Sequence, residues 1–294
     1  MSFAIGLTAA LLASICFNLG IVVQALDARE APREEGMRLT LITRLLRRRR
    51  WLLGLFIGFL GFPLQILAFA DAPFVIVQPA LAVGLLLLLA LGVRMLGERV
   101  GPAEIAGVVA ITAGIGLLAW GAPDHTEQHR SALDVASVMA VLIALTLVPY
   151  LARGRLREAA MPIILSSGLG FAAGNIASKL LSDNVNGRHW LPAALWLGLI
   201  ALTGLFAILG EMTSLQRAPA TRAVPIAFGI QTFLPILLEP LFLRESFDSA
   251  DFSGIPIVLG MLLMLFGILA VARTRAVSAL AAGDLTGALH GERS

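Results

Sequence analysis

Long uncharged apolar runs alternate with short polar segments along almost the whole chain. Each run has the roughly 20 residues that a helix needs to cross a bilayer, and none shows the polar/apolar alternation of an outer-membrane barrel strand. The pattern therefore predicts an all-α membrane protein with about nine transmembrane helices. The runs cover approximately residues 3–25, 51–70, 74–95, 102–121, 133–152, 159–181, 191–212, 223–243 and 254–272.

The composition excludes a soluble enzyme carrying a single anchor. Hydrophobic residues make up 58% of the chain and charged residues 14%, whereas soluble domains have about 45–50% and about 25%. The one cysteine, Cys16, rules out an intramolecular disulfide. The sequence has no P-loop, Gly-x-Ser-x-Gly or His-Glu-x-x-His motif, so we expect no enzymatic activity, no cofactor and no resident metal.

The arginines predict the orientation in the membrane, because cytoplasmic loops collect basic residues. With the N-terminus outside and the C-terminus cytoplasmic, the external loops hold only Arg130, Arg188 and Arg244. The other 18 arginines then lie in cytoplasmic loops 26–50, 94–101, 153–158 and 213–222 and in the tail. This distribution accounts for the net charge of +3 without a nucleic-acid partner, and we expect the inner membrane of a bacterium as the location.

The two halves of the chain carry similar landmarks in the same order. Each half has a polar residue inside an apolar run, a proline 14 residues later, then a glutamate, and a glycine that opens the next run. These landmarks are Gln65, Pro79, Glu98 and Gly107 in the first half and Glu211, Pro225, Glu245 and Gly254 in the second. Because matching helices would cross the membrane in opposite directions, the pattern predicts an inverted repeat of four and five helices.

This repeat divides the chain into four parts. Residues 1–121 form the first repeat and contain the arginine-rich cytoplasmic loop 26–50. Residues 122–132 form an external linker, and residues 133–275 form the second repeat. Residues 276–294 form a polar cytoplasmic tail, for which we expect no regular structure.

Several motifs resemble the drug/metabolite transporter superfamily, with its EamA-like and, most closely, its NIPA-like magnesium-transporter branches. In the first half they are Trp51-Leu52-Leu53-Gly54, Leu67-Ala68-Phe69-Ala70-Asp71-Ala72-Pro73, Val77-Gln78-Pro79 and Leu96-Gly97-Glu98. In the second half they are Glu211-Met212-Thr213-Ser214-Leu215-Gln216-Arg217-Ala218, Val224-Pro225 and Leu243-Arg244-Glu245. The resemblance implies a nine-helix carrier and, for the NIPA-like branch, Mg²⁺ as cargo. The chain has Gly61-Phe62 where that branch has Gly-Glu, and Glu211 where it has Gln.

Polar residues inside the apolar runs are the candidates for a transport pathway, since a charge at the bilayer centre costs about 2.5–3.5 kcal/mol. Glu211 is the first choice, because a carboxylate in a low-dielectric cavity favours uptake of a proton or cation. The alternative is an interfacial Glu211 that pairs with Arg217 or Arg222. The other candidates are Gln65, Asn18, Gln24, Asn175, Lys179, Gln231 and Glu239. For these, hydrogen bonding between helices or contact with the interface is the structural alternative.

These features predict a secondary transporter of a small polar solute that works by alternating access and is proton-coupled through Glu211. One alternative is a NIPA-like Mg²⁺ transporter, although Glu211 and Glu239 are expected ~20 Å apart along the membrane normal. Another is a membrane scaffold or lipid-handling helper that transports nothing. The expected partners are a small polar solute or cation and the lipid bilayer, and a homodimer is compatible with the sequence.

Overall fold

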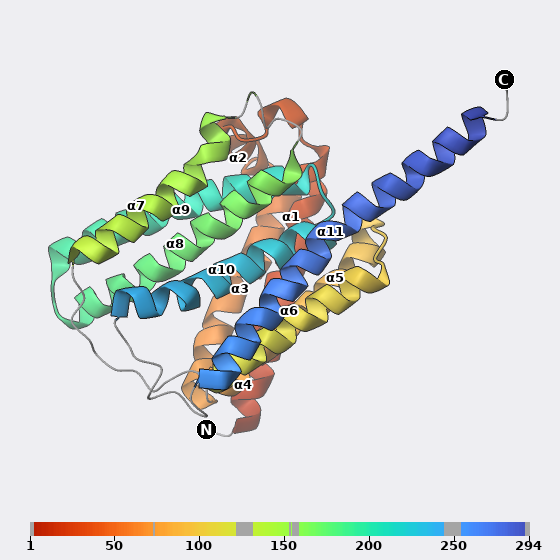
Figure 1. The fold of residues 1–294 in the computed structure, drawn as a ribbon. Helices are drawn as coiled ribbons and strands as arrows, with labels where there is room; N and C mark the ends of the chain where they lie inside the picture. The colour runs from red at the N-terminus through yellow and green to blue at the C-terminus, as the bar shows by residue number, and fades with distance from the viewer. Residues whose placement is uncertain are drawn as a thin grey trace.

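The computed structural model describes residues 3–72, 74–121, 132–152, 154, 159–243 and 254–291, and every secondary-structure element in these ranges is a helix. Figure 1 shows the helices as one bundle. They are α1 (Phe3–Glu30), η1 (Arg33–Glu35), α2 (Leu39–Leu45), α3 (Arg49–Asp71), α4 (Phe74–Ala82), α5 (Gly84–Leu96), α6 (Pro102–Gly121), α7 (Ala132–Leu151), α8 (Ala160–Asn186), α9 (Trp190–Leu215), α10 (Ala220–Leu243) and α11 (Ile255–Gly291).

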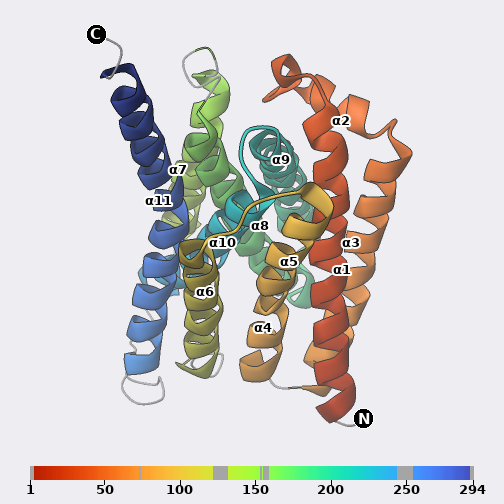
Figure 2. The same cartoon turned by 90° about the vertical axis from the view of Figure 1, so that its right-hand side faces the viewer.

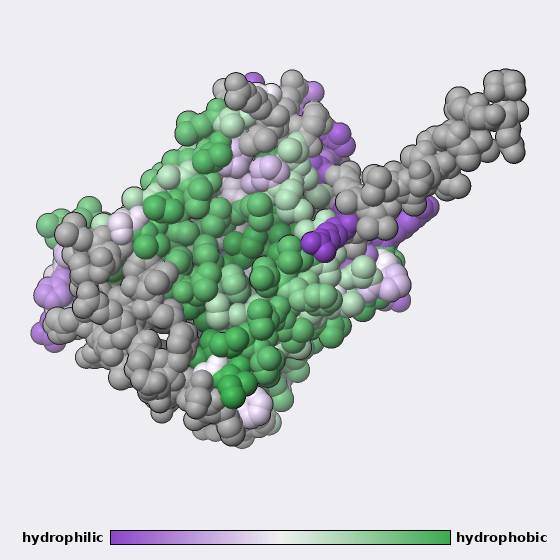
Figure 3. Space-filling model, in the orientation of Figure 1, coloured by the Kyte–Doolittle hydropathy of each residue, from purple (hydrophilic) through white to green (hydrophobic). Residues whose placement is uncertain are grey.

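The bundle has the surface of a multi-pass integral membrane protein. Within the described residues, eight spans are long and apolar enough to cross a bilayer, with α4 and α5 forming one of them, and Val135–Leu151 of α7 is a shorter apolar helix. Large apolar side chains such as Phe59, Ile66 and Leu195 are exposed by 66%, 71% and 69%. The face in Figure 3 is a broad apolar surface whose hydrophilic residues gather toward the ends of the helices. A surface of this kind belongs in lipid.

The helices alternate in direction and pair in a regular way. Figure 2 shows the N-terminus at one end of the bundle and the C-terminus at the other. Helix α1 packs along α3 and against α4 and α5, while α8 packs along α9 and against α10. We call residues 3–121 the first half and residues 132–291 the second half. The end of the bundle that carries residues 27–50, 97–101 and 216–222 is called the arginine-rich end.

The apolar run 74–95 predicts one helix, but the structure breaks it at Val83 into α4 and α5. The amide of Leu86 donates to Val83 O at 2.9 Å and not to Ala82 O, the acceptor four residues earlier that a continuous helix would use. The Ala82 carbonyl therefore has no partner within its own helix. Hydroxyl groups from neighbouring helices replace the lost partners: Ser14 donates to Leu81 O at 2.6 Å and Thr112 to Ala82 O at 3.3 Å. Such replacement is required because a free carbonyl in lipid is costly.

Two helix boundaries also differ from the expectation. Helix α1 continues to Glu30, so Asp27 and Arg29 lie on a helix rather than in a loop. Helix α11 continues to Gly291 and projects beyond the bundle (Figure 1), so the expectation of an irregular tail is wrong up to that residue. The segment after residue 275 is rich in alanine and lacks proline, a composition that favours helix.

Glycines bring α6 and α11 into backbone contact along their whole shared length. Gly107, Gly114 and Gly121 recur every seven residues on α6, and Gly260 and Gly267 do so on α11. A Cβ at Gly114 would lie 2.7 Å from Gly260 O, and one at Gly267 would lie 2.5 Å from Gly107 O. Small residues at this spacing let two helices approach closely, which is the main source of packing energy between helices in lipid.

A second close contact joins α1 and α3. A Cβ at Gly20 would lie 2.7 Å from Gly54 O, and a Cβ at Gly54 would lie 2.7 Å from Gly20 O. Gly58 lies one turn after Gly54 on the same helix, yet a Cβ there would meet nothing within 4 Å. The two glycines of this Gly-x-x-x-Gly motif are therefore not equivalent.

We expect Gly54→Ala to destabilise the folded protein by about 1–3 kcal/mol, because the added methyl group overpacks the contact with Gly20. Gly58→Ala has room for its methyl group and should stabilise α3 slightly, since alanine favours helix over glycine by about 0.5–1 kcal/mol. Thermal unfolding of both variants in the same detergent measures the difference. Equal shifts in Tm for the two variants would contradict this account of the α1–α3 contact.

Candidate functional site

The buried apolar side chains form three clusters, of which one joins the two halves and two lie within a single half. One cluster, which we call the shared cluster, unites both halves and includes Val22, Leu88, Met212 and Ala223. A second cluster is built from α1, α3 and α4 of the first half alone. A third is built from α7, α8, α9 and α10 of the second half alone. Among the described residues, the cores of the two halves therefore merge mainly toward the arginine-rich end and along α6 and α11.

Glu211 lies on α9, on the side of the helix that faces the bundle. It follows the lipid-exposed Leu202 by nine residues, about two and a half turns, which places it on the opposite face. Ile208, on the same face, packs against the shared cluster. A Cβ at Gly204, seven residues before Glu211 and on the same side of α9, would meet nothing within 4 Å, so no neighbouring helix packs closely against α9 at that level.

The Glu211 carboxylate makes no hydrogen bond or ion pair with any residue that the structure describes, although the side chain is half-buried. The alternative pairing with Arg222 is not observed, because Arg222 pairs with Glu104 at 3.3 Å. An unpaired carboxylate inside a membrane helix is costly and is a candidate for binding a proton, a cation or a polar ligand.

Hydroxyl groups of α7 and α8 donate to backbone carbonyls in the same part of the bundle. Tyr150 on α7 donates to Phe206 O at 2.5 Å, and Ser166 and Ser167 on α8 donate to Thr146 O at 2.6 Å and Ala207 O at 3.0 Å. These bonds join α7, α8 and α9, the helix that carries Glu211. Such hydroxyl–carbonyl bonds between membrane helices are worth on the order of 0.6 kcal/mol each.

Asn18 lies beside the break between α4 and α5. Its side-chain amide donates to Ser14 O at 2.8 Å on the same helix. A Cβ at Gly84, the first residue of α5, would overlap both the Asn18 amide nitrogen and the Ser14 hydroxyl. Glycine at position 84 therefore lets both polar side chains of α1 reach the broken helix.

Asn175 and Gln231, predicted separately, are brought together by the fold. The Asn175 side-chain amide donates to Gln231 O at 3.3 Å. Pro235 lies four residues after Gln231 and has no N–H, so the Gln231 carbonyl lacks its partner within α10. Asn175 on α8 supplies the missing donor.

For the remaining predicted residues, the structure gives the burial or a packing contact but no hydrogen bond, or does not describe the side chain. Gln24 is half-buried, and its Cγ would lie 2.9 Å from a Cβ at Gly54, so it packs at the α1–α3 contact. Gln65 is half-buried on α3. The side chains of Lys179 on α8 and Glu239 on α10 lie outside the described residues. In the part of the chain that is described, no group of three or more His, Cys, Asp or Glu residues could hold a metal ion.

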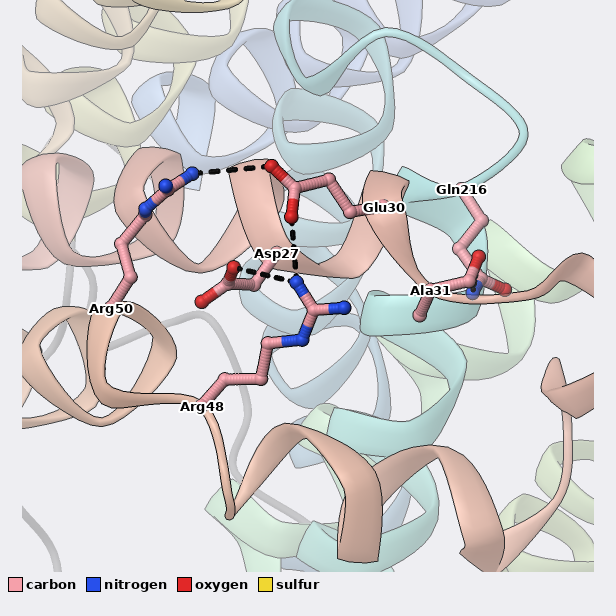
Figure 4. Close-up of polar contacts among 6 residues, drawn as sticks. All are labelled: Asp27, Glu30, Ala31, Arg48, Arg50 and Gln216. Atoms are coloured by element: carbon pink, nitrogen blue, oxygen red, sulfur yellow. Dashed lines mark hydrogen bonds and ion pairs between the residues drawn. The ribbon is translucent and has the colours of Figure 1, made fainter.

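The arginine-rich end contains a network that the sequence did not reveal. Figure 4 shows Arg48 pointing between Asp27 and Glu30 of α1, at 3.4 and 2.6 Å, while Arg50 contacts Glu30 at 3.3 Å. Arg44 of α2 pairs with Glu35, and this hydrogen bond lowers the pKa of Glu35. These pairs stay within the first half.

Other polar contacts at this end cross between the halves. The Gln216 side-chain amide donates to Ala31 O at 3.4 Å, close beside α1 in Figure 4, and Met37 N donates to the Thr213 hydroxyl at 3.0 Å. Glu98, after α5, pairs with Arg29 of α1 and accepts from the first amides of α10. The sequence gives one indirect sign of the Glu98 contact. Helix α10 starts after Pro219 and has no Ser, Thr, Asp or Asn at that position to cap its first amides.

The fold and these contacts define a multi-pass helical membrane protein with a carboxylate on the inner face of one span. No family model matches the chain. It is similar to an uncharacterized protein of Corynebacterium glutamicum, with 23% identity over 278 residues that cover 92% of this chain and 95% of that protein. No solved structure matches. The similarity to the Corynebacterium protein runs over almost the full length of both chains.

We expect Asn175→Ala to lower stability by about 1 kcal/mol, because the Gln231 carbonyl would lose its donor. In the Pro235→Ala background an amide becomes available within α10, so the same Asn175→Ala substitution should cost clearly less. Thermal unfolding of the four proteins of this double-mutant cycle in detergent measures the coupling. An equal cost of Asn175→Ala in both backgrounds would show that the Gln231 carbonyl is not the reason for the Asn175 contact.

Proposed function

We propose that the protein is a secondary transporter of a small polar solute in a bacterial inner membrane, with an inverted repeat like that of the drug/metabolite transporters. Glu211 binds the proton or cation that couples to transport. The observation that carries the proposal is the half-buried, inward-facing carboxylate of Glu211, which has no partner among the described residues. Intramembrane ionisable groups in such positions mark ion and substrate pathways.

The helix pairing supports the repeat. Helices α1 and α3 in the first half correspond to α8 and α9 in the second, and the α4–α5 pair corresponds to α10. Helices α6 and α11 would be the remaining equivalent pair, and they pack antiparallel on each other through glycines. Asparagines of the two helices α1 and α8 lie at equivalent places: Asn18 of α1 lies beside Gly84 of the α4–α5 pair, and Asn175 of α8 donates to Gln231 O of α10.

The way in which the halves are joined supports alternating access. The contact of α6 with α11 can act as the axis, and the remaining helices of each half rock around it. Glu211 lies on the inner face of α9 near the level at which the two cores merge. Proton or cation binding neutralises its charge, which lowers the cost of moving the carboxylate through a dry intermediate.

A polar solute fits these residues better than Mg²⁺. Magnesium retains several waters and is bound through one or two carboxylates, but no metal-binding group of three acidic, His or Cys residues occurs in the described ranges. The chain offers Glu211 as the single unpaired carboxylate on the inner face of α9. Mg²⁺ flux is nevertheless the direct comparison for the NIPA-like resemblance, and the experiment below includes it.

We expect Glu211→Gln to reduce proton-coupled uptake by at least tenfold in proteoliposomes, because glutamine keeps the shape but cannot carry a proton or an opposing charge. The assay adds amino acids, amines, sugars and Mg²⁺ in turn and records internal pH with a trapped dye. Glu35→Gln is the matched control, since Glu35 pairs with Arg44 away from the inner face of α9.

Each outcome assigns a role. Solute uptake with the same pH dependence in Glu211→Gln removes the coupling role from Glu211 and leaves the fold intact. Saturable Mg²⁺ uptake that the substitution abolishes makes Mg²⁺ the cargo. No flux of any tested compound above empty liposomes, with folded protein, favours a scaffold or lipid-handling role.

A further inference from the structure

We propose that Glu98 is a latch that holds the arginine-rich end of the protein closed between the two halves, and that it must release α10 before a solute can leave at that end. The inference rests on the proposed alternating-access function. It concerns the passage between the halves and not the coupling group Glu211.

The Glu98 side chain is only 4% exposed and reaches from the first half into the start of a helix of the second half. Gly97 ends α5 in the left-handed conformation, with φ of 66°, and this turn directs Glu98 back toward the bundle. One carboxylate oxygen accepts from Ala220 N at 2.6 Å, and the other accepts from Thr221 N at 2.8 Å.

The Glu98 contact supplies hydrogen-bond acceptors that the start of α10 lacks. The first amides of any helix lack partners within the helix. Arg222 N and Ala223 N donate to Pro219 O, so Ala220 N and Thr221 N are the two amides that remain. Pro219 has no side-chain acceptor, and the Glu98 carboxylate takes that place. Its negative charge also lies at the positive end of the α10 dipole, which adds to the attraction.

Three further residues of the first half support the contact. Arg29 of α1 forms an ion pair with the Glu98 oxygen that binds Ala220 N. Gly92 allows the approach, since a Cβ there would overlap the Thr221 methyl group and lie 3.1 Å from a Glu98 oxygen. Glu104, at the start of α6, pairs with Arg222 at 3.3 Å. Two carboxylates of the first half therefore hold the first turn of α10.

The apolar packing shows why this end is the closed one. Around Glu98, the shared cluster joins both halves through Leu88, Leu89, Ala220 and Ala223. Toward the opposite end, the described clusters of α1, α3 and α4 and of α7 to α10 each belong to one half. Rocking the halves apart at the arginine-rich end must break the Glu98 contacts with Ala220 and Thr221, whereas rocking at the opposite end leaves them intact.

The test measures access of water-soluble reagent to a residue beneath the latch. Ala223→Cys is introduced together with Cys16→Ala, so that the reporter is the one cysteine of the chain. Ala223 is 2% exposed and lies one turn into α10. The full-length protein is reconstituted in liposomes, and the rate of labelling by a membrane-impermeant maleimide is measured. Glu98→Gln is compared with Glu35→Gln, which removes an equal charge at the same end without touching α10.

We expect Glu98→Gln to raise the labelling rate of the reporter cysteine about tenfold or more, since a charge-assisted double hydrogen bond and an ion pair are weakened together. Glu35→Gln should label at the rate of its parent. Arg29→Gln, which keeps the carboxylate cap, should give a smaller increase and serves if Glu98→Gln does not fold. A labelling rate for Glu98→Gln or for Arg29→Gln equal to that of the parent, in monodisperse protein, overturns the latch.

The readout separates this inference from the proposed function. Faster labelling of Glu98→Gln with no transport of any solute supports closure of the arginine-rich end by Glu98 and removes the transporter. Unchanged labelling, together with loss of coupled uptake in Glu211→Gln, removes the latch and keeps the transporter.

Discussion

The close antiparallel packing of α6 on α11 is the constraint on which the rest of the bundle depends. Carbonyl oxygens of Gly107 and Gly114 lie where a side chain on Gly267 or Gly260 would have to be, so any larger residue would push the helices apart. Among the described elements, this is the contact between the halves that runs the full length of a span. Every other contact between the halves must be compatible with this packing.

Most polar groups inside the membrane are used to satisfy backbone atoms. Ser14 and Thr112 bond the carbonyls at the break between α4 and α5, and Asn175 bonds the carbonyl that Pro235 leaves free. In lipid no water is available for these atoms, so each interruption of a helix requires a side chain from a neighbour. Glu211 differs from this group, because its carboxylate bonds no described backbone or side chain. That difference separates a functional candidate from structural ones.

Charges at the arginine-rich end combine two roles. The basic residues of α2 and α3 set the expected orientation, yet Arg48 and Arg50 also bond the acidic residues at the end of α1. Glu98 extends this network into the second half through the first amides of α10. Contacts between charged and polar groups at this end therefore join the two halves of the protein.

The sequence by itself determined the class of protein and the approximate position of each span, because apolar runs of about 20 residues have few alternatives to a membrane helix. It also identified Glu211, since a carboxylate stands out in an apolar run. It could not predict the break at Val83 or the pairing of Asn175 with Gln231, which depend on a partner distant in the chain. Only the tertiary structure could decide that Glu98 caps α10. A hydrogen bond between residues 122 positions apart leaves no local pattern, because it arises from where the two halves come to rest.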